Sequence, residues 1–450
     1  MNIIKRSILP GLLALLSAVR ADAKDIIISN PQSTPRTVPE MVEVPADAFS
    51  GITGSSQDAL FLCVVTPQGD TLTTQQTHDG KLIFPCPPLK GKETVRLKVC
   101  TTRQAAASQV FGRNFPEREN DFSFENDRVA YRLYGPGTKG LYGYDMFCKK
   151  TPKLVLQRWY AMQCDEQMWA THRKMVRAGH KKLAEEMSNS VFSYHVDHGE
   201  GMDQYSVGST MGAGAVAYMT PCDDKSCAVT SPKGSKNAAK PAANGDDKIA
   251  GNAATSVAQG GEKSASKAPR LHYTGPFTSA EVVDSGPLRL TVRLTYGSDT
   301  RLLTIDAHSN MVKSTVIPNE TTAGLTPVAG IAIHQDGKEY SIDGASVAYE
   351  DAGGMLIGCY MPGGKACYAP LAKVTSGATG HVMLAPMAKK RHAKKSAGKG
   401  EKAVPGEMTY YFGSAWTLYE GDNITSMQQW KDYISAFAKQ KENPLKVIIK

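Results

Sequence analysis

Two stretches in the second half of the chain decide its fold: GPLRLTVRLTY at residues 286–296 and TRLLTIDAHSNMVKSTVIP at residues 300–318. Both alternate apolar with polar residues, and Gly, Asn or Pro interrupts them, which is typical of half-buried strands joined by tight turns. Similar runs follow, among them GIAIHQDGKEYSI, GMLIGCYMP, HVMLAPM and EMTYYFGSAWTL. These strands are too many for one small sandwich, so the sequence predicts a large double-layered antiparallel sheet.

The chain divides into two folded parts around this prediction. Residues 24–105 hold short apolar runs separated by Pro, Gly and Asp-Gly turns, which predict a separate N-terminal β-sandwich. Residues 106–450 are expected to form the large β-supersandwich. Two helices are expected within it, one ending near Ser188 and an amphipathic one at residues 426–442 that caps the sheet. The predicted fold class is mainly β with a few helices.

The first residues have the features of a secretory signal peptide, predicted at residues 1–23. Lys5 and Arg6 precede an apolar run from Ile8 to Val19, and Ala21-Asp22-Ala23 supplies a small-x-small cleavage site. The run is too short to span a bilayer, and no later run is long enough to form a transmembrane segment. We therefore expect a periplasmic or extracellular protein.

Export would make the nine cysteines candidates for disulfide bonds. Two pairs bracket short loops and are expected to staple them: Cys222 with Cys227, and Cys359 with Cys367. Three others lie in apolar, strand-like stretches and are expected to be buried thiols, with one disulfide among them as the alternative: Cys63, Cys86 and Cys100.

The basic charge of the chain lies outside its predicted folded parts. The formal net charge is +9, but segments 231–270 and 388–405 carry +4 and +6, which leaves −3 on the rest of the mature chain. Both segments are built of Ala, Gly, Ser and Lys with few large apolar residues, so they are predicted to be disordered inserts. No nucleic-acid-binding motif accompanies them, and contact of these inserts with polyanions stays an alternative.

One Gly-rich loop, YHVDHGEGMDQYSVGSTMGAG at residues 194–214, concentrates titratable side chains. They are His195, Asp197, His198, Glu200 and Asp203. A strand over Tyr194–Asp197 would place His195 and Asp197 on one face. Clusters of this kind occur where pKa values are shifted for chemistry, which favours an acid/base or sugar-binding role. A solvated turn and a metal site stay open, although the spacing matches no zinc pattern.

Two further stretches add candidate residues. In DFSFENDRVAYRLYGP, residues 121–136, the segment Glu125–Arg128 separates two strand-like pieces, and Arg128 is expected to line a groove. The alternative is an Asn-Asp turn with an ion pair inside the sheet. His334 lies in a strand-like run and is a further candidate, with a hydrogen-bonded sheet histidine as the alternative; His308 is a weaker one.

These stretches, together with SGPLRLTVRLTY, IDAHSN and GIAIHQDG, resemble domain-of-unknown-function family 4861. Its members are secreted bacterial proteins encoded in polysaccharide-utilisation loci, and the resemblance covers nearly all of the mature chain except the two inserts. At fold level the sequence is also similar to galactose-mutarotase-like supersandwich proteins. Epimerases, polysaccharide lyases and some glycoside hydrolases share that fold, so the resemblance implies carbohydrate chemistry without deciding which.

The resemblance and the residue patterns lead to one function hypothesis with alternatives. We expect a polysaccharide lyase or glycoside hydrolase that acts on an acidic, uronate-containing glycan. The predicted catalytic residues are His195, Glu200, Asp203, Tyr205 and His334. The predicted substrate-binding residues are Glu125, Asn126, Asp127, Arg128, Asp197 and His198.

The alternatives are a noncatalytic glycan-binding or cell-surface protein and a sugar mutarotase or epimerase. No cofactor is assigned, and a divalent cation held by loop carboxylates stays open. Convergence of His195, Glu200, Asp203, Arg128 and His334 in one pocket would favour the enzyme, whereas scattered positions would favour the binding protein.

Overall fold

The computed structural model describes residues 24–50, 61–220, 270–387, 403–421 and 424–450. Within these residues most secondary structure is antiparallel β-sheet, with four α-helices, which confirms the predicted mainly-β sandwich fold. The predicted signal peptide, most of both inserts, and Cys222 and Cys227 lie outside the described residues.

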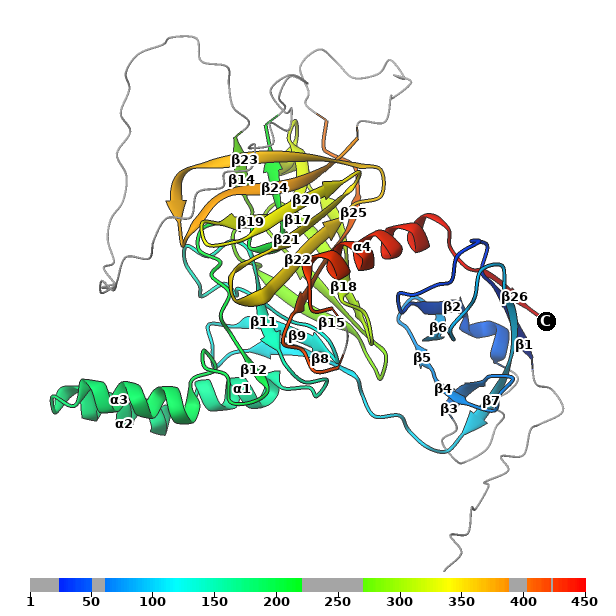
Figure 1. The fold of residues 1–450 in the computed structure, drawn as a ribbon, viewed down its shortest axis with the longest axis horizontal. Coiled ribbons are helices and arrows are strands. Elements are labelled where there is room, and N and C mark those ends of the chain that lie inside the picture. The colour runs from blue at the N-terminus through cyan, green and yellow to red at the C-terminus, as the bar shows by residue number, and fades with distance from the viewer. Residues whose placement is uncertain (1–23, 51–60, 221–269, 388–402, 422–423) are drawn as a thin grey trace, which may run out of the picture.

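An N-terminal sandwich pairs two sheets around a small apolar core (Figure 1). One sheet has the order β26-β1-β7-β3-β4 and the other β2-β6-β5. Their bounds are β1 Asp25–Ser29, β2 Met41–Pro45, β3 Phe61–Val65, β4 Thr71–Thr73, β5 Gln75–Gln76, β6 Lys81–Pro85, β7 Thr94–Thr102 and β26 Lys446–Ile449, with a 3-10 turn at Ala46–Phe49. Residues 446–449 fall within the predicted second domain, yet β26 pairs antiparallel with β1, so both ends of the described chain meet in this sandwich.

The larger part has two layers with a common core. One layer is an eight-stranded sheet in the order β15-β16-β17-β18-β25-β22-β21-β20. Its bounds are β15 Ser279–Ser285, β16 Arg289–Thr295, β17 Asp299–Asp306, β18 Met311–Pro318, β20 Glu339–Asp343, β21 Ser346–Glu350, β22 Met355–Tyr360 and β25 Met408–Trp416. The 3-10 turns Glu320–Thr322 and Ala352–Gly354 connect strands.

Two five-stranded sheets form the second layer, and the bridge between Tyr144 and Gly212 links them. Their orders are β12-β11-β10-β9-β8 and β14-β13-β19-β24-β23. Their bounds are β8 Val110–Phe115, β9 Asp121–Asn126, β10 Ala130–Leu133, β11 Tyr144–Lys149, β12 Gly201–Met202, β13 Ala213–Met219, β14 Leu271–Tyr273, β19 Thr326–His334, β23 Gly364–Thr375 and β24 Ala378–Pro386.

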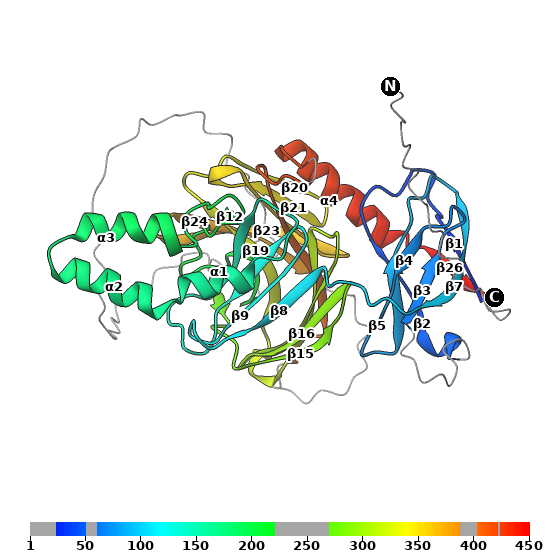
Figure 2. The ribbon, with the colours of Figure 1, turned by 90° about the horizontal axis from the view of Figure 1, so that it is seen from below.

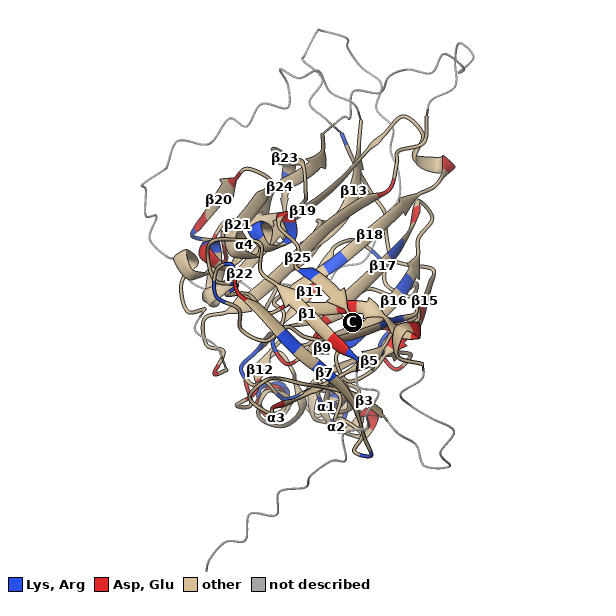
Figure 3. Ribbon diagram, turned by 90° about the vertical axis from the view of Figure 1, so that its right-hand side faces the viewer, with Lys and Arg blue, Asp and Glu red and all other residues tan. Residues whose placement is uncertain are grey.

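Alternation along β17 shows how the sequence orients the eight-stranded sheet. Leu303 and Ile305 are buried in the core, whereas Leu302, Thr304 and Asp306 are only half-buried on the outer face. Successive side chains of a strand point to opposite faces, so the outer faces of β16, β17 and β18 present a polar surface. Figure 3 shows basic positions on the strands of this sheet.

Helices cover two places on the sandwich. The helix expected to end near Ser188 is three helices, α1 Leu156–Gln163, α2 Glu166–Arg177 and α3 Lys181–Met187, followed by a π-helical turn at Ser188–Phe192. The hairpin α2–α3 projects from the body (Figure 2). The predicted amphipathic helix is α4, Met427–Glu442, which packs on the outer face of the eight-stranded sheet.

Candidate functional site

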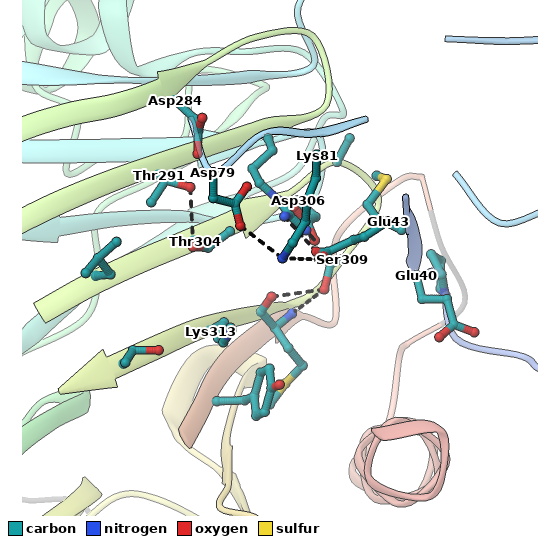
Figure 4. Close-up of a pocket in the computed structure, with 18 of the residues that line it drawn as sticks. Glu40, Glu43, Asp79, Lys81, Asp284, Thr291, Thr304, Asp306, Ser309 and Lys313 are labelled. Atoms are coloured by element: carbon teal, nitrogen blue, oxygen red, sulfur yellow. Dashed lines mark hydrogen bonds and ion pairs between the residues drawn. The ribbon is translucent and has the colours of Figure 1, made fainter. Parts of the chain in front are cut away.

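A cleft of about 300 Å³ lies between the N-terminal sandwich and the outer face of the eight-stranded sheet. Strand β2 and the β5–β6 turn line it from the sandwich, β15 to β18 and β25 line it from the sheet, and α4 adds its C-terminal part. Most of the side chains around it are polar or charged (Figure 4). The cleft therefore exists only because the two folded parts meet.

The wall of the cleft contributed by the sheet is one cross-strand row. Thr291, Thr304, Lys313 and Tyr411 occupy successive paired positions on β16, β17, β18 and β25. The hydroxyl oxygens of Thr291 and Thr304 lie 3.3 Å apart. Directly opposed residues on one face of a sheet lie side by side, so this row forms a continuous polar strip.

The acidic residues of the cleft are held in ion pairs. Glu43 Oε2 lies 2.9 Å from Lys81 Nζ, and Glu43 Oε1 lies 2.7 Å from Arg289 Nη1. Arg289 also donates to the Asp306 carboxylate, and Lys81 Nζ lies 2.9 Å from Asp79 Oδ2. Burial would raise the pKa of Glu43, but the charges of Arg289 and Lys81 outweigh it and lower that pKa. Glu43 is thus an ionised structural anchor of the cleft.

Two other carboxylates of the cleft are paired as well. The buried Asp284 accepts from the backbone N–H of His78 at 2.7 Å and lies 2.7 Å from His78 Nδ1. Glu40 accepts from Arg36 Nη2 at 3.1 Å. The five carboxylates that line the cleft therefore all have cationic or imidazole partners.

Two lysines of the cleft stand in contrast to these pairs. Among the described residues, no ion pair involves Lys313 or Lys441. The Lys441 ammonium lies 5.7 Å from the ring centre of Tyr411 and 5.1 Å from that of Phe437. Desolvation by the surrounding protein lowers the pKa of Lys441. Lys313 and Lys441 are therefore the cationic side chains of the cleft that form no direct ion pair with a described residue, although Asp306, Glu40 and Glu43 act on Lys441 from a longer range.

Glu125 and Asn126, predicted to bind substrate, hold the fold together. The buried Glu125 accepts from Lys149 Nζ at 2.8 Å and from the backbone N–H groups of Val155 and Leu156 at 2.8 and 2.7 Å. Asn126 accepts from two backbone N–H groups in its own turn. The arrangement is the turn with an ion pair inside the sheet that the sequence left as the alternative.

Asp127 and Arg128 lie near a second cavity, which adjoins the cleft. Asp127 accepts from the backbone N–H of His308 at 2.6 Å and lies 2.9 Å from His308 Nδ1. Arg128 and His308 line a cavity of about 420 Å³ together with Pro85–Pro88 of the sandwich. Both cavities share Pro39, Glu40, Met41 and Ala307 as lining residues.

The loop at residues 194–214 has another conformation than predicted. Tyr194–Asp197 is a turn instead of the predicted strand, and the glycines at positive φ begin after it, at Gly199. Asp197 accepts from the backbone N–H groups of Gly199 and Gly201. His198 Nε2 lies 3.0 Å from the Ser193 carbonyl oxygen, and Glu200 pairs with Arg158.

Two of the predicted catalytic residues, Asp203 and His195, lie close to each other. Asp203 is buried and accepts from Arg132 at 2.9 Å, and Arg132 also contacts Asp145 and Tyr194. His195 Nδ1 lies 3.5 Å from Asp203 Oδ2, while the His195 side chain is 55% exposed. Burial lowers the pKa of His195 and raises that of Asp145 to about 7.

Tyr205 and His334 form another buried group. Their ring centres lie 5.4 Å apart in an edge-to-face arrangement. His334 Nδ1 lies 2.7 Å from Asp351 Oδ2, and Nε2 lies 2.9 Å from the Ser206 carbonyl oxygen. The Tyr205 hydroxyl has no hydrogen-bond partner among the described residues.

The structure joins His195 with Asp203 and Tyr205 with His334, and Asp145, which Arg132 links to Asp203, also acts electrostatically on Tyr205. Arg128 lies at another cavity, and none of the predicted residues lines the cleft. Sequence reasoning missed Lys313 and Arg289, whose outer-face positions follow from strand alternation. It had no signal for Glu43 and Lys81, which reach the cleft from the other sandwich.

No group of three or more His, Cys, Asp or Glu side chains in the described ranges is arranged to hold a metal ion. No helix in this part of the chain is both long and apolar enough to cross a bilayer.

Comparison with known proteins confirms the family resemblance. The family described as "Domain of unknown function (DUF4861)" matches residues 28–246 and 252–447. An uncharacterized protein, P7, of Formosa agariphila is 29% identical over 118 residues, which cover 24% of each chain.

Two solved structures from Enterococcus faecalis are similar at 9% identity: an alpha-mannosidase, with a TM-score of 0.43, and a protein in glycosyl hydrolase family 38, with a TM-score of 0.41. The similarity covers 95% of this chain but only 46% and 47% of theirs. This chain thus spans about half the length of these two structures and about a quarter of P7.

Proposed function

Since the chain belongs to the DUF4861 family, whose function its description leaves open, we propose from the cleft geometry that the protein binds an acidic carbohydrate there. One observation carries the proposal. The polar strip of β16, β17, β18 and β25 runs along the wall of the cleft, and neither Lys313 within it nor Lys441 beside it forms an ion pair with a described carboxylate.

Each part of this arrangement has a role toward an acidic sugar. The half-buried Thr304 hydroxyl, supported by the buried Thr291 beside it, exchanges hydrogen bonds with sugar hydroxyls, and the Tyr411 ring supplies an apolar face. Ammonium groups neutralise a carboxylate or sulfate, and these charge-assisted bonds are about twice as strong as neutral ones. The carboxylates of the cleft pair with other cations or with His78, so the ammonium groups of Lys313 and Lys441 stay available for direct contact with an anion.

The expected localisation is part of this proposal. Export directed by the predicted signal peptide, residues 1–23, would place the protein in the periplasm or outside the cell, where polysaccharides occur. None of the predicted catalytic residues lines the cleft, so the binding proposal rests on the cleft side chains alone.

A calorimetric titration of the purified protein with uronate oligosaccharides tests the proposal. We expect Lys313→Ala and Lys441→Ala each to weaken binding about 10- to 100-fold, because each removes a charged hydrogen bond worth about 1.5–3 kcal/mol. Lys373→Ala, an exposed lysine on β23 outside the cleft lining, is the matched control and should bind like the unmodified protein. A neutral oligosaccharide of equal length should bind more weakly. Unchanged binding by both cleft variants would refute the proposal.

A second candidate function rests on the contact between His195 and Asp203. An exposed imidazole whose Nδ1 lies 3.5 Å from a buried carboxylate is placed as a general base is in many enzymes. In a lyase, His195 would remove the proton α to a uronate carboxyl group, and Asp203 would orient the imidazole. In a hydrolase, Glu200 would act with a second carboxylate.

Incubation with a panel of acidic polysaccharides separates these two functions. Ultraviolet absorbance of an unsaturated uronate, lost in His195→Ala and Glu200→Ala, would support the lyase. New reducing ends without absorbance would support a hydrolase. Binding that depends on Lys313 and Lys441, with no cleavage product formed, would support carbohydrate binding without catalysis.

A further inference from the structure

Two cysteines of the N-terminal sandwich face each other across neighbouring strands. Cys63 on β3 and Cys100 on β7 are direct register partners in an antiparallel pair. Directly opposed residues have Cα atoms about 4.5–5.5 Å apart and side chains on the same face of the sheet. A disulfide needs Cα atoms about 4.4–6.8 Å apart, so this backbone accommodates one without rearrangement.

The other described cysteines lack such a partner. Cys359 and Cys367, expected to form a staple, are free thiols in different sheets, because β22 belongs to the eight-stranded sheet and β23 to the second layer. Cys359 faces Val347 and Phe412, and Cys367 faces Met383. Within the described residues, β3 and β7 are therefore the strands that place two cysteines directly opposite each other.

Accessibility gives the two thiols different roles. Cys63 is 4% exposed, whereas Cys100 is half-buried, so a reagent in solution reaches Cys100 first. Cys100 Sγ lies 3.7 Å from the Cys63 carbonyl oxygen. The hydrogen bond from the Cys63 thiol lowers the pKa of Cys100, while the same interaction raises that of Cys63. Cys100 is thus the attacking thiol and Cys63 the resolving one.

We propose that Cys63 and Cys100 are a redox modification site, which a small-molecule or protein disulfide oxidises to a cross-strand disulfide. The Cys100 thiolate attacks one sulfur of the oxidant and expels a thiolate, which leaves a mixed disulfide on Cys100. Cys63 then loses its proton and attacks the Cys100 sulfur, which expels the second thiolate. Two protein thiols are oxidised, and the oxidant is reduced to two thiols. The bond ties β3 to β7 in the sandwich whose β2 and β5–β6 turn line the cleft.

Peptide mapping of the purified protein tests the proposal. Reduced protein is treated with oxidised glutathione, remaining thiols are alkylated, and the digest is analysed by mass spectrometry. We expect peptides containing Cys63 and Cys100 to be joined, with dithiothreitol restoring both thiols. The midpoint of thermal unfolding of the sandwich should rise by about 10 °C on oxidation.

Conservative variants assign the two roles. Cys63→Ser should trap one glutathione on Cys100, whereas Cys100→Ser should leave Cys63 as a thiol. Cys86→Ser, in the same sandwich, is the matched control and should oxidise like the unmodified protein. Alkylation of both Cys63 and Cys100 after oxidant treatment of folded protein would overturn the proposal. So would a stable mixed disulfide on Cys100, or a peptide that joins either residue to another cysteine.

Discussion

At the scale of single residues, His334 shows how a buried polar group is stabilised. Its two ring nitrogens face two acceptors, Asp351 Oδ2 and the Ser206 carbonyl oxygen. Both nitrogens can donate only if the imidazole is protonated. Burial would lower the pKa of His334, but the Asp351 carboxylate outweighs it and raises that pKa. The predicted catalytic histidine is thus half of a buried ion pair.

This pair makes stability depend on pH. Because the pKa of His334 is higher in the folded protein than its ordinary value, its contribution is complete below about pH 6 and is lost as pH rises through the raised pKa. We expect His334→Gln to lower the free energy of unfolding by about 3–5 kcal/mol at low pH and by less at high pH.

Urea unfolding of the unmodified protein and of His334→Gln, from below about pH 6 to above the raised pKa of His334, measures this difference in stability. His381→Gln is the matched control, because burial lowers the pKa of His381 to about 4 and its Nε2 accepts from the Met211 backbone N–H. The cost of that variant should change in the opposite direction and become smaller as pH falls below about 6.5, because His381 then takes up a proton in the unfolded protein but not in the folded one. A pH-independent cost for His334→Gln would show that His334 is neutral.

At the scale of elements, the N-terminus of α1 depends on a strand residue. No side chain at the helix start caps it, and Glu125 on β9 accepts from its first backbone N–H groups instead. The same carboxylate pairs with the fully buried Lys149. A negative charge at a helix N-terminus is favourable because it satisfies free donors and complements the helix dipole.

Glu125→Gln tests whether this residue is structural. The variant leaves Lys149 without its carboxylate, so we expect the free energy of unfolding to fall by about 3–5 kcal/mol and amide exchange in α1 to quicken. Glycan affinity of the folded fraction should stay unchanged. Glu166→Gln, an exposed glutamate in the first turn of α2, should change stability by less than about 0.5 kcal/mol. Normal stability with lost glycan binding would make Glu125 a ligand contact after all.

At the scale of the whole molecule, the contact between the two sandwiches shapes the cleft. The buried Gln75 of β5 donates to the Arg289 carbonyl oxygen at 2.9 Å and accepts from the N–H groups of Leu288 and Arg289. His78 with Asp284 and Glu43 with Arg289 add charged contacts across the same junction. Strand β26 and helix α4 connect both parts covalently.

Gln75→Ala should weaken this junction. Three backbone groups lose their partner, at a cost of about 1–3 kcal/mol for each group left unsatisfied. We expect calorimetry to show the N-terminal sandwich unfolding at a lower temperature and uronate binding to weaken. Gln76→Ala, the exposed neighbour on the same strand, is the matched control. A single unchanged transition in Gln75→Ala would mean that other contacts hold the junction.

The sequence by itself determined the mainly-β fold and the outer faces of β16 to β18, because strand alternation is a local property that apolar periodicity records. It also predicted the helix α4 and left the turn after β9 as an alternative.

Only the tertiary structure decided the site. The partners of Glu125, Asp203 and His334 are distant in sequence, so their burial in ion pairs left no local signal. Glu43, Arg289 and Lys441 come together from three separate segments, because a cleft between two folded parts depends on how they pack and not on any one stretch of sequence.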